Sequence, residues 1–199
     1  MATFQKRINL SDEERNVNFR PRARHTRMPP SDEPARFCDE TGEALNAAAR
    51  AVVAEAIGAD RARDDVSNDA AAKLGPVLRS VPIVKLERGT HKYVQVQLTH
   101  PDEPGTAILV VRSVDARRCP YHADVYRALV DELGSDARTR GVIGRVIGGG
   151  RIRRDAATVS VYGYSKTFGR TRGCNERTAE LIRANVDGLA SVEWSDDGY

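Results

Sequence analysis

One histidine stands where the sequence predicts the start of a helix. Pro120 suits the first turn of a helix, and apolar residues recur at helical spacing from Val125 to Leu133, which predicts a helix over residues 121–134. His122 then lies in the first turn, where the positive end of the helix dipole favours an anion and disfavours an imidazolium. The position predicts a neutral, nucleophilic histidine beside an anion site. The alternative is a half-exposed histidine that merely starts the helix.

Three glycines followed by an arginine occupy residues 148–151. The run is too short, and wrongly placed, for a dinucleotide-binding fingerprint or a Walker A loop. One interpretation is a tight turn between two strands. The other is that the glycines let the backbone approach a ligand closely, while Arg151 offers a two-pronged hydrogen-bond donor to a phosphate.

Residues 162–169 join a predicted strand to a predicted helix and include Ser165 and Thr167. Loops at strand ends of α/β sheets commonly hold ligands. Hydroxyl groups and exposed amides in such a loop can form an anion-binding nest. A solvated connector is an equally common interpretation.

The elements that must position these segments follow from hydrophobic patterning. Residues 93–98 alternate between apolar and polar, which predicts a half-buried strand, and the continuous apolar run 107–111 predicts a central strand covered on both faces. Further strands are predicted at 81–86, 142–147, 158–164 and 191–194, and helices at 121–134 and 176–185. Strands interspersed with two helices predict an α/β fold with a mixed sheet covered on both faces.

The first 80 residues differ from the rest in composition. Residues 1–30 carry seven Lys or Arg against three acids, so we expect residues 1–36 to be a basic arm that is disordered alone, serving either to bind a partner or as a solvated tail. A narrow, Ala-rich stripe predicts a helix over 43–57, which stops at Gly58 and packs on the main domain or on another protein. Residues 59–75 read as a linker with one more helical turn. The predicted organisation is an arm (1–36), a helical extension and linker (37–80) and an α/β domain (81–199).

Composition excludes several classes of protein. The chain has 199 residues, a net charge of +3 and 40% hydrophobic residues, and no apolar run approaches the roughly 20 residues that span a bilayer. Its three cysteines lie far apart without a C-x-x-C pair, which supports neither a disulfide framework nor a zinc site. The N-terminus lacks the apolar region of a secretory signal. The expected location is a reducing compartment, the cytoplasm by default, with no membrane partner.

Several segments together resemble one known family. In chain order they are KYV at 92–94, YHADVY at 121–126, GGGRI at 148–152, VYGYS at 161–165, and Trp194 followed by a terminal DGY. Over residues 81–199 the sequence resembles the phosphohistidine phosphatase (Janus/Ocnus) family. The resemblance implies a six-stranded mixed sheet between two helices, and a phosphatase that acts on phosphohistidine in proteins without metal or cofactor.

The resemblance also implies a role for individual residues. His122 matches the catalytic histidine, while Lys92 and Arg151 match the side chains that hold the phosphoryl group. Ser165 and the main chain near Thr167 join them. Arg112 matches a further basic residue of the site.

Two segments depart from the family pattern. Residues 117–120 replace the family's usual residues before Tyr121, and Lys166 and Thr167 differ in the substrate loop. These changes leave the expected chemistry intact and bear on the choice of substrate. Basic residues in and near these segments would favour an acidic substrate surface, or would simply be solvated charge; they are Arg117, Arg118, Arg153, Arg154, Lys166, Arg170 and Arg172.

Two functions from different classes follow. The first is a protein histidine phosphatase in which His122 either attacks phosphorus or deprotonates a water, tethered to a larger assembly by the N-terminal extension. The second is a phosphatase-like structural subunit of a cytoskeletal, axonemal or ribosomal assembly, anchored through residues 1–80, because fold does not imply function. Nucleic acid is not the expected partner, since the arm interleaves few aromatic residues with its charges.

Overall fold

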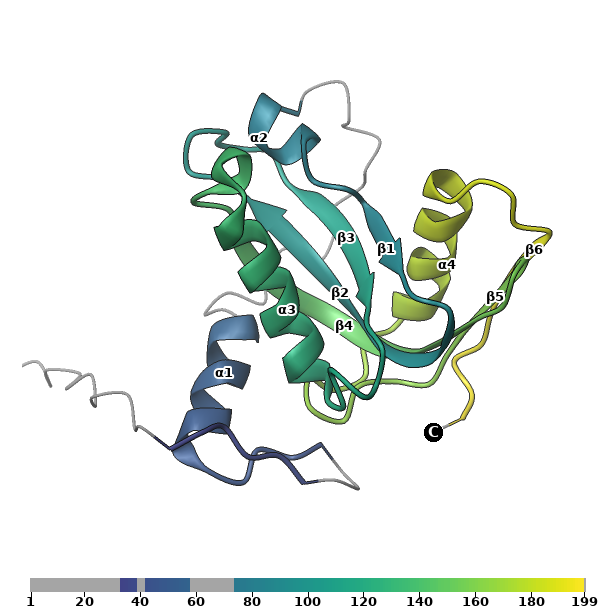
Figure 1. The fold of residues 1–199 in the computed structure, drawn as a ribbon, viewed down its shortest axis with the longest axis horizontal. Coiled ribbons are helices and arrows are strands. Elements are labelled where there is room, and N and C mark those ends of the chain that lie inside the picture. The colour runs from purple at the N-terminus through teal and green to yellow at the C-terminus, as the bar shows by residue number, and fades with distance from the viewer. Residues whose placement is uncertain (1–32, 39–41, 58–73, 199) are drawn as a thin grey trace, which may run out of the picture. The chain divides into compact units, whose positions relative to one another are not determined.

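The structure is a computed structural model, and it describes residues 33–38, 42–57 and 74–198. Its elements, in chain order, are α1 (Ala47–Ile57), α2 (Pro76–Arg79), β1 (Val84–Leu86), β2 (Gly89–Thr99), β3 (Ile108–Ser113), α3 (His122–Ser135), a 3-10 turn η2 (Ala137–Thr139), β4 (Ile143–Arg154), β5 (Thr158–Tyr162), α4 (Cys174–Asn185) and β6 (Ser191–Trp194) (Figure 1). Most of the predicted basic arm, the predicted stop at Gly58 and most of the predicted linker lie outside the described residues.

The six strands form one mixed sheet in the order β1-β3-β2-β4-β5-β6. The two outer pairs, β1 with β3 and β5 with β6, are parallel, and the three inner pairs are antiparallel. The predicted fold class, a six-stranded mixed sheet between two helices, is confirmed. None of the helices that the structure describes has the length and apolar character needed to cross a bilayer.

The two faces of the sheet carry separate cores, and Figure 1 shows α3 and α4 on opposite sides of the sheet. Because successive side chains of a strand point to opposite faces, β2 contributes Val94 and Val96 to the core under α3 and Tyr93 to the core under α4. The α3 stripe predicted from the sequence, including Val125 and Leu129, is buried against the first of these faces. The helix that carries His122 is therefore fixed to the sheet along its length.

The strand predicted at residues 93–98 is present within β2, but the prediction that it is half-buried is wrong. This part of β2 is buried on both faces, including Gln95 and Gln97. Gln95 donates to the hydroxyl of Thr178 in α4, and Gln97 accepts from the guanidinium of Arg145 in β4. Buried amides are tolerated when they are hydrogen-bonded. The polar residues of this strand, Gln95 and Gln97, are therefore hydrogen-bonded core residues and do not form a solvated face.

The prediction that residues 148–151 separate two strands is also wrong, because β4 continues through the glycines to Arg154. Gly149 and Gly150 pair directly with Val94 and Tyr93 of β2. A Cβ on Gly149 would lie 2.5 Å from the carbonyl oxygen of Tyr93, and one on Gly150 would lie 2.6 Å from that of Tyr162. The glycines are needed for close packing of backbones within the sheet, which contradicts the tight turn. Close approach of this backbone to a ligand stays a prediction.

The N-terminal helix begins later than predicted. Residues 43–46 are not helical, and α1 starts at Ala47, where the side chain of Asn46 accepts from the N–H of Ala49 at 2.9 Å. Asparagine is among the preferred N-cap residues, and Asn46 caps the helix in place of the start predicted at residue 43. Of the two packing partners predicted for this helix, the structure shows the main domain: Ala49 and Ala56 are buried against it.

Candidate functional site

His122 is the first residue of α3, with Tyr121 as its N-cap. The carboxylate of Asp124 accepts from the N–H of Tyr121 at 3.1 Å and so fixes the first turn. The imidazole of His122 is buried, with its Nε2 atom 3.0 Å from the carbonyl oxygen of Gly150 in β4. Because a carbonyl only accepts hydrogen bonds, Nε2 carries the proton and Nδ1 keeps its lone pair.

The surroundings of His122 keep the ring neutral. The pKa of His122 is lowered from 6.5 to about 4, mainly by burial and also by the positive charges of Lys92 and Arg151, against the opposing effect of the hydrogen bond to the Gly150 carbonyl. A neutral imidazole at neutral pH is the form that acts as a nucleophile or a base. The lowered pKa agrees with the neutral histidine predicted from the helix start, and its largest cause is burial, which the dipole argument left out. A nucleophilic role for His122 stays a prediction.

Lys92 and Arg151 are direct cross-strand partners on β2 and β4. Both line a cavity of about 220 Å³, together with Thr90, His91 and Ala116. Burial, and then repulsion from Arg151, lowers the pKa of Lys92. Two neighbouring cations at the start of a helix form a site that an anion would stabilise.

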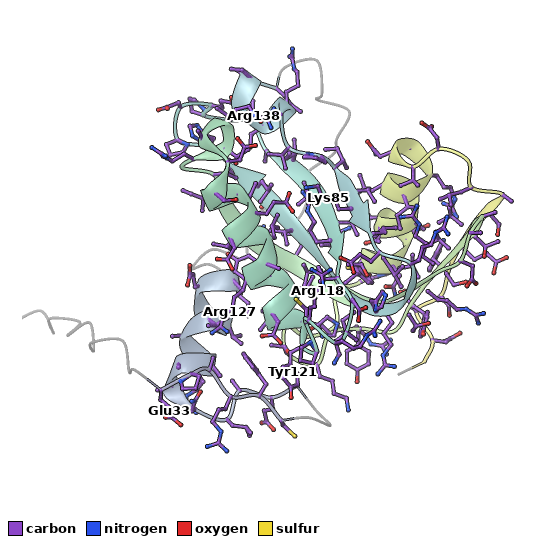
Figure 2. The ribbon with its side chains drawn as sticks, viewed as in Figure 1. Glu33, Lys85, Arg118, Tyr121, Arg127 and Arg138 are labelled. Atoms are coloured by element: carbon purple, nitrogen blue, oxygen red, sulfur yellow. The ribbon has the colours of Figure 1, made fainter. Side chains whose placement is uncertain are left out.

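Tyr121 links Lys92 to the start of α3. The ammonium group of Lys92 donates to the carbonyl oxygen of Pro120 and lies 5.4 Å from the centroid of the Tyr121 ring. Figure 2 shows Tyr121 at the end of α3 that faces the segment leading into α1. Lys92 is therefore held next to His122 by Pro120 and Tyr121, the two residues that directly precede the histidine in the chain.

The predicted substrate loop, residues 162–169, is organised by its own hydroxyl groups. Ser165 is fully buried, and its Oγ accepts from the N–H of Phe168 at 3.1 Å. The hydroxyl of Thr167 donates to the carbonyl oxygen of Gly42 at 2.8 Å. Phe168 and Tyr121 pack against one small hydrophobic cluster, which brings the loop to the start of α3. Contact of Ser165 or the main chain at Thr167 with a phosphoryl group stays a prediction.

Arg112 lies in the core and not at the cavity. It is 2% exposed, and its guanidinium donates to the carboxylate of Glu132 in α3 at 3.2 Å and to the carbonyl oxygen of Val111 at 3.0 Å. Burial lowers the pKa of Arg112, while Glu132 acts in the opposite direction. Its side chain ties β3 to the helix that carries His122, and direct phosphate binding by Arg112 stays a prediction.

Sequence analysis missed His91, which lines the cavity beside Lys92. Its Nδ1 accepts from the N–H of Ala116 at 3.2 Å, and its Nε2 donates to the carbonyl oxygen of Arg88 at 2.8 Å. The ring thereby holds the loop between β3 and α3. Its position directly before Lys92 is the sequence signal that could have placed His91 near the site. Its hydrogen bond to Ala116 could not be predicted, because the two residues are far apart in the sequence.

The exposed arginines before Tyr121 are paired with nearby carboxylates. Arg117 forms an ion pair with Asp115 at 3.1 Å, and Arg118, labelled in Figure 2, pairs with Glu87. Solvent-exposed ion pairs of this kind contribute little stability, but they reduce the net positive charge of the loop. This pairing weakens the argument that the loop attracts an acidic substrate surface.

A larger cavity, of about 560 Å³, lies next to the N-terminal end of α4 and is lined by residues that include Gln95, Cys174 and Arg177. It contains none of the site residues predicted from the sequence. In the part of the chain that the structure describes, no three His, Cys, Asp or Glu side chains gather as a metal-binding group. The site of interest is thus the smaller cavity with Lys92 and Arg151, next to His122.

Comparison with known proteins places the chain in a family. The model of the Janus/Ocnus family (Ocnus) matches residues 78–189. The 14 kDa phosphohistidine phosphatase of Sus scrofa is 31% identical over 127 residues, which cover 61% of this chain and 95% of the relative. The Homo sapiens protein of the same name is 28% identical over 127 residues (61% and 96%), and the sex-regulated protein janus-B of Drosophila melanogaster is 28% identical over 109 residues (54% and 71%). With the fold, the site and this match together, the chain belongs to the Janus/Ocnus family.

Proposed function

We propose that this protein hydrolyses phosphohistidine in protein substrates without a metal ion, and that His122 is its catalytic residue. The observation that carries the proposal is the buried, neutral imidazole of His122, oriented by Gly150 and close enough to Lys92 and Arg151 for both to lower its pKa. The names of the pig and human relatives support the same class of substrate.

In this proposal the two cations bind the phosphoryl oxygens. Phosphoryl transfer spreads negative charge over three equatorial oxygens, so positioning and electrostatic stabilisation supply most of the catalysis. Lys92 and Arg151 lie as partners across β2 and β4, which fixes their separation without a flexible loop. Ser165 and the main chain at Thr167 complete the proposed set of binding groups, whereas Arg112 would support the site from the core by holding α3 through Glu132.

Two chemical routes use the same Nδ1 lone pair. In the first, Nδ1 attacks phosphorus, the P–N bond of the substrate breaks, and the leaving imidazole nitrogen keeps the electron pair and takes a proton; water then hydrolyses the phosphorylated His122. In the second, Nδ1 accepts the proton of a water whose oxygen attacks phosphorus, while the P–N bond of the substrate breaks and the leaving imidazole nitrogen keeps the electron pair and takes a proton. A phosphoryl group retained on the wild-type protein after an alkaline denaturing quench, and absent from His122→Ala, would select the first route.

The proposal is tested by turnover of a phosphohistidine peptide in excess chelator. Wild-type protein should release phosphate, and Lys92→Met or Arg151→Met should lower the rate by roughly 10²- to 10³-fold, as loss of one oxyanion-stabilising donor does. Arg153→Met is a matched control on β4, because Arg153 is exposed and paired with Asp155 at 3.3 Å. No turnover by folded wild-type protein would overturn the proposal.

A structural subunit of an assembly is the second candidate, because the name of the Drosophila relative states no reaction. In that case residues 1–80 would anchor the chain, and the basic arm would bind the assembly. Anchoring and turnover are compatible, with the arm tethering an active enzyme in a reducing compartment such as the cytoplasm. A chain that lacks turnover and still co-sediments with a filament or ribosomal fraction would favour the second candidate alone.

A further inference from the structure

The segment before α1 forms a small ladder that lies outside the family match, which begins at residue 78. We call residues 36–38 and 42–45 the N-terminal ladder. Its backbone is paired by three hydrogen bonds: Leu45 N–H to Arg36 O at 2.8 Å, Cys38 N–H to Glu43 O at 2.8 Å, and Gly42 N–H to Cys38 O at 2.7 Å. The ladder is therefore a defined structure and an addition of this chain to the family fold.

Asn46 joins the ladder to α1. Its side-chain oxygen accepts from the N–H groups of Arg36 at 3.1 Å and Ala49 at 2.9 Å, and its amide donates to Pro34 O at 2.9 Å. Since α1 packs on α3 and β4 through buried alanines, the ladder has a firm base on the main domain.

The first contact of the ladder with the site is aromatic. Phe37 is 6% exposed, and its ring centroid lies 5.7 Å from that of Tyr121 with the planes tilted by 35°. Tyr121 is the N-cap of α3, directly before His122, and the ammonium group of Lys92 lies over its ring. Phe37 therefore contacts Tyr121, whose ring in turn contacts Lys92, one of the two cations proposed to bind phosphate.

The second contact is a hydrogen bond to the substrate loop. The hydroxyl of Thr167 donates to Gly42 O at 2.8 Å. A Cβ on Gly42 would lie 2.9 Å from that hydroxyl, and the φ angle of Gly42 is +69°, so this approach suits glycine for two reasons. The ladder thus contacts both the start of α3 and the substrate loop, two segments far apart in the sequence.

We infer that the N-terminal ladder is a positioning element for the phosphoryl-binding site, with Phe37 and Thr167 as its two points of attachment. The inference rests on the proposed function, because the groups it positions are those that would hold the phosphoryl group. Donors that are fixed before the substrate arrives stabilise charge at lower cost than donors that must be ordered on binding. Phe37 belongs to a small cluster that shares only Phe168 with the core under α3, so we expect the main domain to fold without this contact.

The experiment uses the full chain and two paired substitutions. Phe37→Ala removes the aromatic contact and Phe37→Leu retains apolar volume. Thr167→Val removes the hydroxyl at nearly constant shape and Thr167→Ser restores a donor. Leu45→Ala is the matched control, since this ladder side chain is 54% exposed. Affinity for inorganic phosphate and kcat/KM for a phosphohistidine peptide are measured for each variant, with thermal unfolding to confirm that the main domain is folded.

We expect Phe37→Ala and Thr167→Val each to weaken phosphate binding and to lower kcat/KM by about 5-fold, the scale of one hydrogen bond or small contact. Phe37→Leu and Thr167→Ser should recover most of the loss, and Leu45→Ala should match wild type. The double variant Phe37→Ala with Thr167→Val should lose less than the product of the two single effects, because both act through one ladder.

The possible failures are separable. Wild-type turnover with unchanged phosphate affinity and kcat/KM in Phe37→Ala and Thr167→Val would overturn this inference and leave the proposed function standing. Phosphate affinity that falls in both variants, in a protein without turnover, would overturn the proposed function and retain the positioning role. Wild-type protein that neither binds phosphate nor turns over the peptide would overturn both.

Discussion

The Nε2 atom of His122 lies 3.0 Å from the carbonyl oxygen of Gly150. Gly150 directly precedes Arg151 on β4, and Arg151 pairs across the sheet with Lys92. One strand therefore orients the imidazole through its backbone and presents, through its next side chain, a cation proposed to bind phosphate. The fixed tautomer leaves Nδ1 as the nitrogen available for chemistry.

The low pKa of His122 predicts a pH-dependent stability. Because the folded-state pKa of about 4 lies below the ordinary 6.5, the unfolded chain binds the proton more readily, so the free energy of unfolding falls as pH falls through this window. The difference corresponds to about 3 kcal/mol lost between pH 6.5 and pH 4. Urea unfolding of wild type and His122→Gln at both ends of the window measures it; parallel pH dependences of the two proteins would refute the assignment.

The lowered pKa of Lys92 predicts an alkaline limit to phosphate binding. Burial and the neighbouring Arg151 favour the neutral amine, so the cation is lost at a pH below its ordinary value of 10.5, and phosphate affinity should fall in that range. Lys92→Arg keeps a charge throughout it. Titration of phosphate binding against pH should show the fall in wild type and not in Lys92→Arg; the same fall in both would assign it to another group.

The glycines of β4 predict a contrast between two Gly→Ala substitutions. In Gly149→Ala the new Cβ would lie 2.5 Å from the carbonyl oxygen of Tyr93 and 3.2 Å from the Cδ2 atom of His122, so the backbone must shift and stability should fall by several kcal/mol. Gly134 in α3 has open space around its Cα, and Gly134→Ala should raise the free energy of unfolding by about 1 kcal/mol. Denaturant unfolding tests both; equal effects would contradict the close packing of β4 on β2.

Substitution of a buried asparagine in α4 should lower both the stability of the fold and the order of the substrate loop. Asn175 is 3% exposed, accepts from the hydroxyl of Tyr93 at 2.6 Å, and donates to the carbonyl oxygens of Gly163 and Ser195, each at 2.9 Å. Asn175→Leu leaves these groups without their partner and should cost about 3 kcal/mol. It should also raise KM, because Gly163 lies in the substrate loop.

The matched control for Asn175 lies at the end of the same helix. Asn185 is exposed and its amide donates to a carbonyl of its own helix, that of Leu181. Asn185→Ala should change the free energy of unfolding by less than about 0.5 kcal/mol, as exposed substitutions usually do. If Asn175→Leu lowers the free energy of unfolding no more than Asn185→Ala does, the hydrogen bonds of Asn175 do not stabilise the fold as predicted.

Local patterns were enough to predict most elements of this fold. The stripe from Val125 to Leu129 and the apolar run of β3 each report burial within a few residues of themselves. The path of β4 was not predictable in this way. Whether three glycines turn or continue as a strand depends on β2, whose Tyr93 lies more than fifty residues earlier in the chain.

The same distinction holds for the site. His122 could be predicted because a helix start is a local feature, whereas the pairing of Lys92 with Arg151 needed the sheet register. The partners of Arg112 and Thr167, which are Glu132 and Gly42, come from other elements and carry no signal in the surrounding sequence. Cross-element contacts of this kind depend on tertiary packing, which periodicity and spacing do not encode.

Turnover of a phosphohistidine peptide by His122→Ala, measured beside His100→Ala, tests the central claim most directly. His100 is a comparable buried histidine, 8% exposed, with its Nε2 atom 3.1 Å from the carbonyl oxygen of Arg140, and it does not line the cavity. We predict that His122→Ala folds but loses turnover, while His100→Ala retains it. Turnover by folded His122→Ala within a few-fold of wild type would contradict the claim that His122 is the catalytic residue.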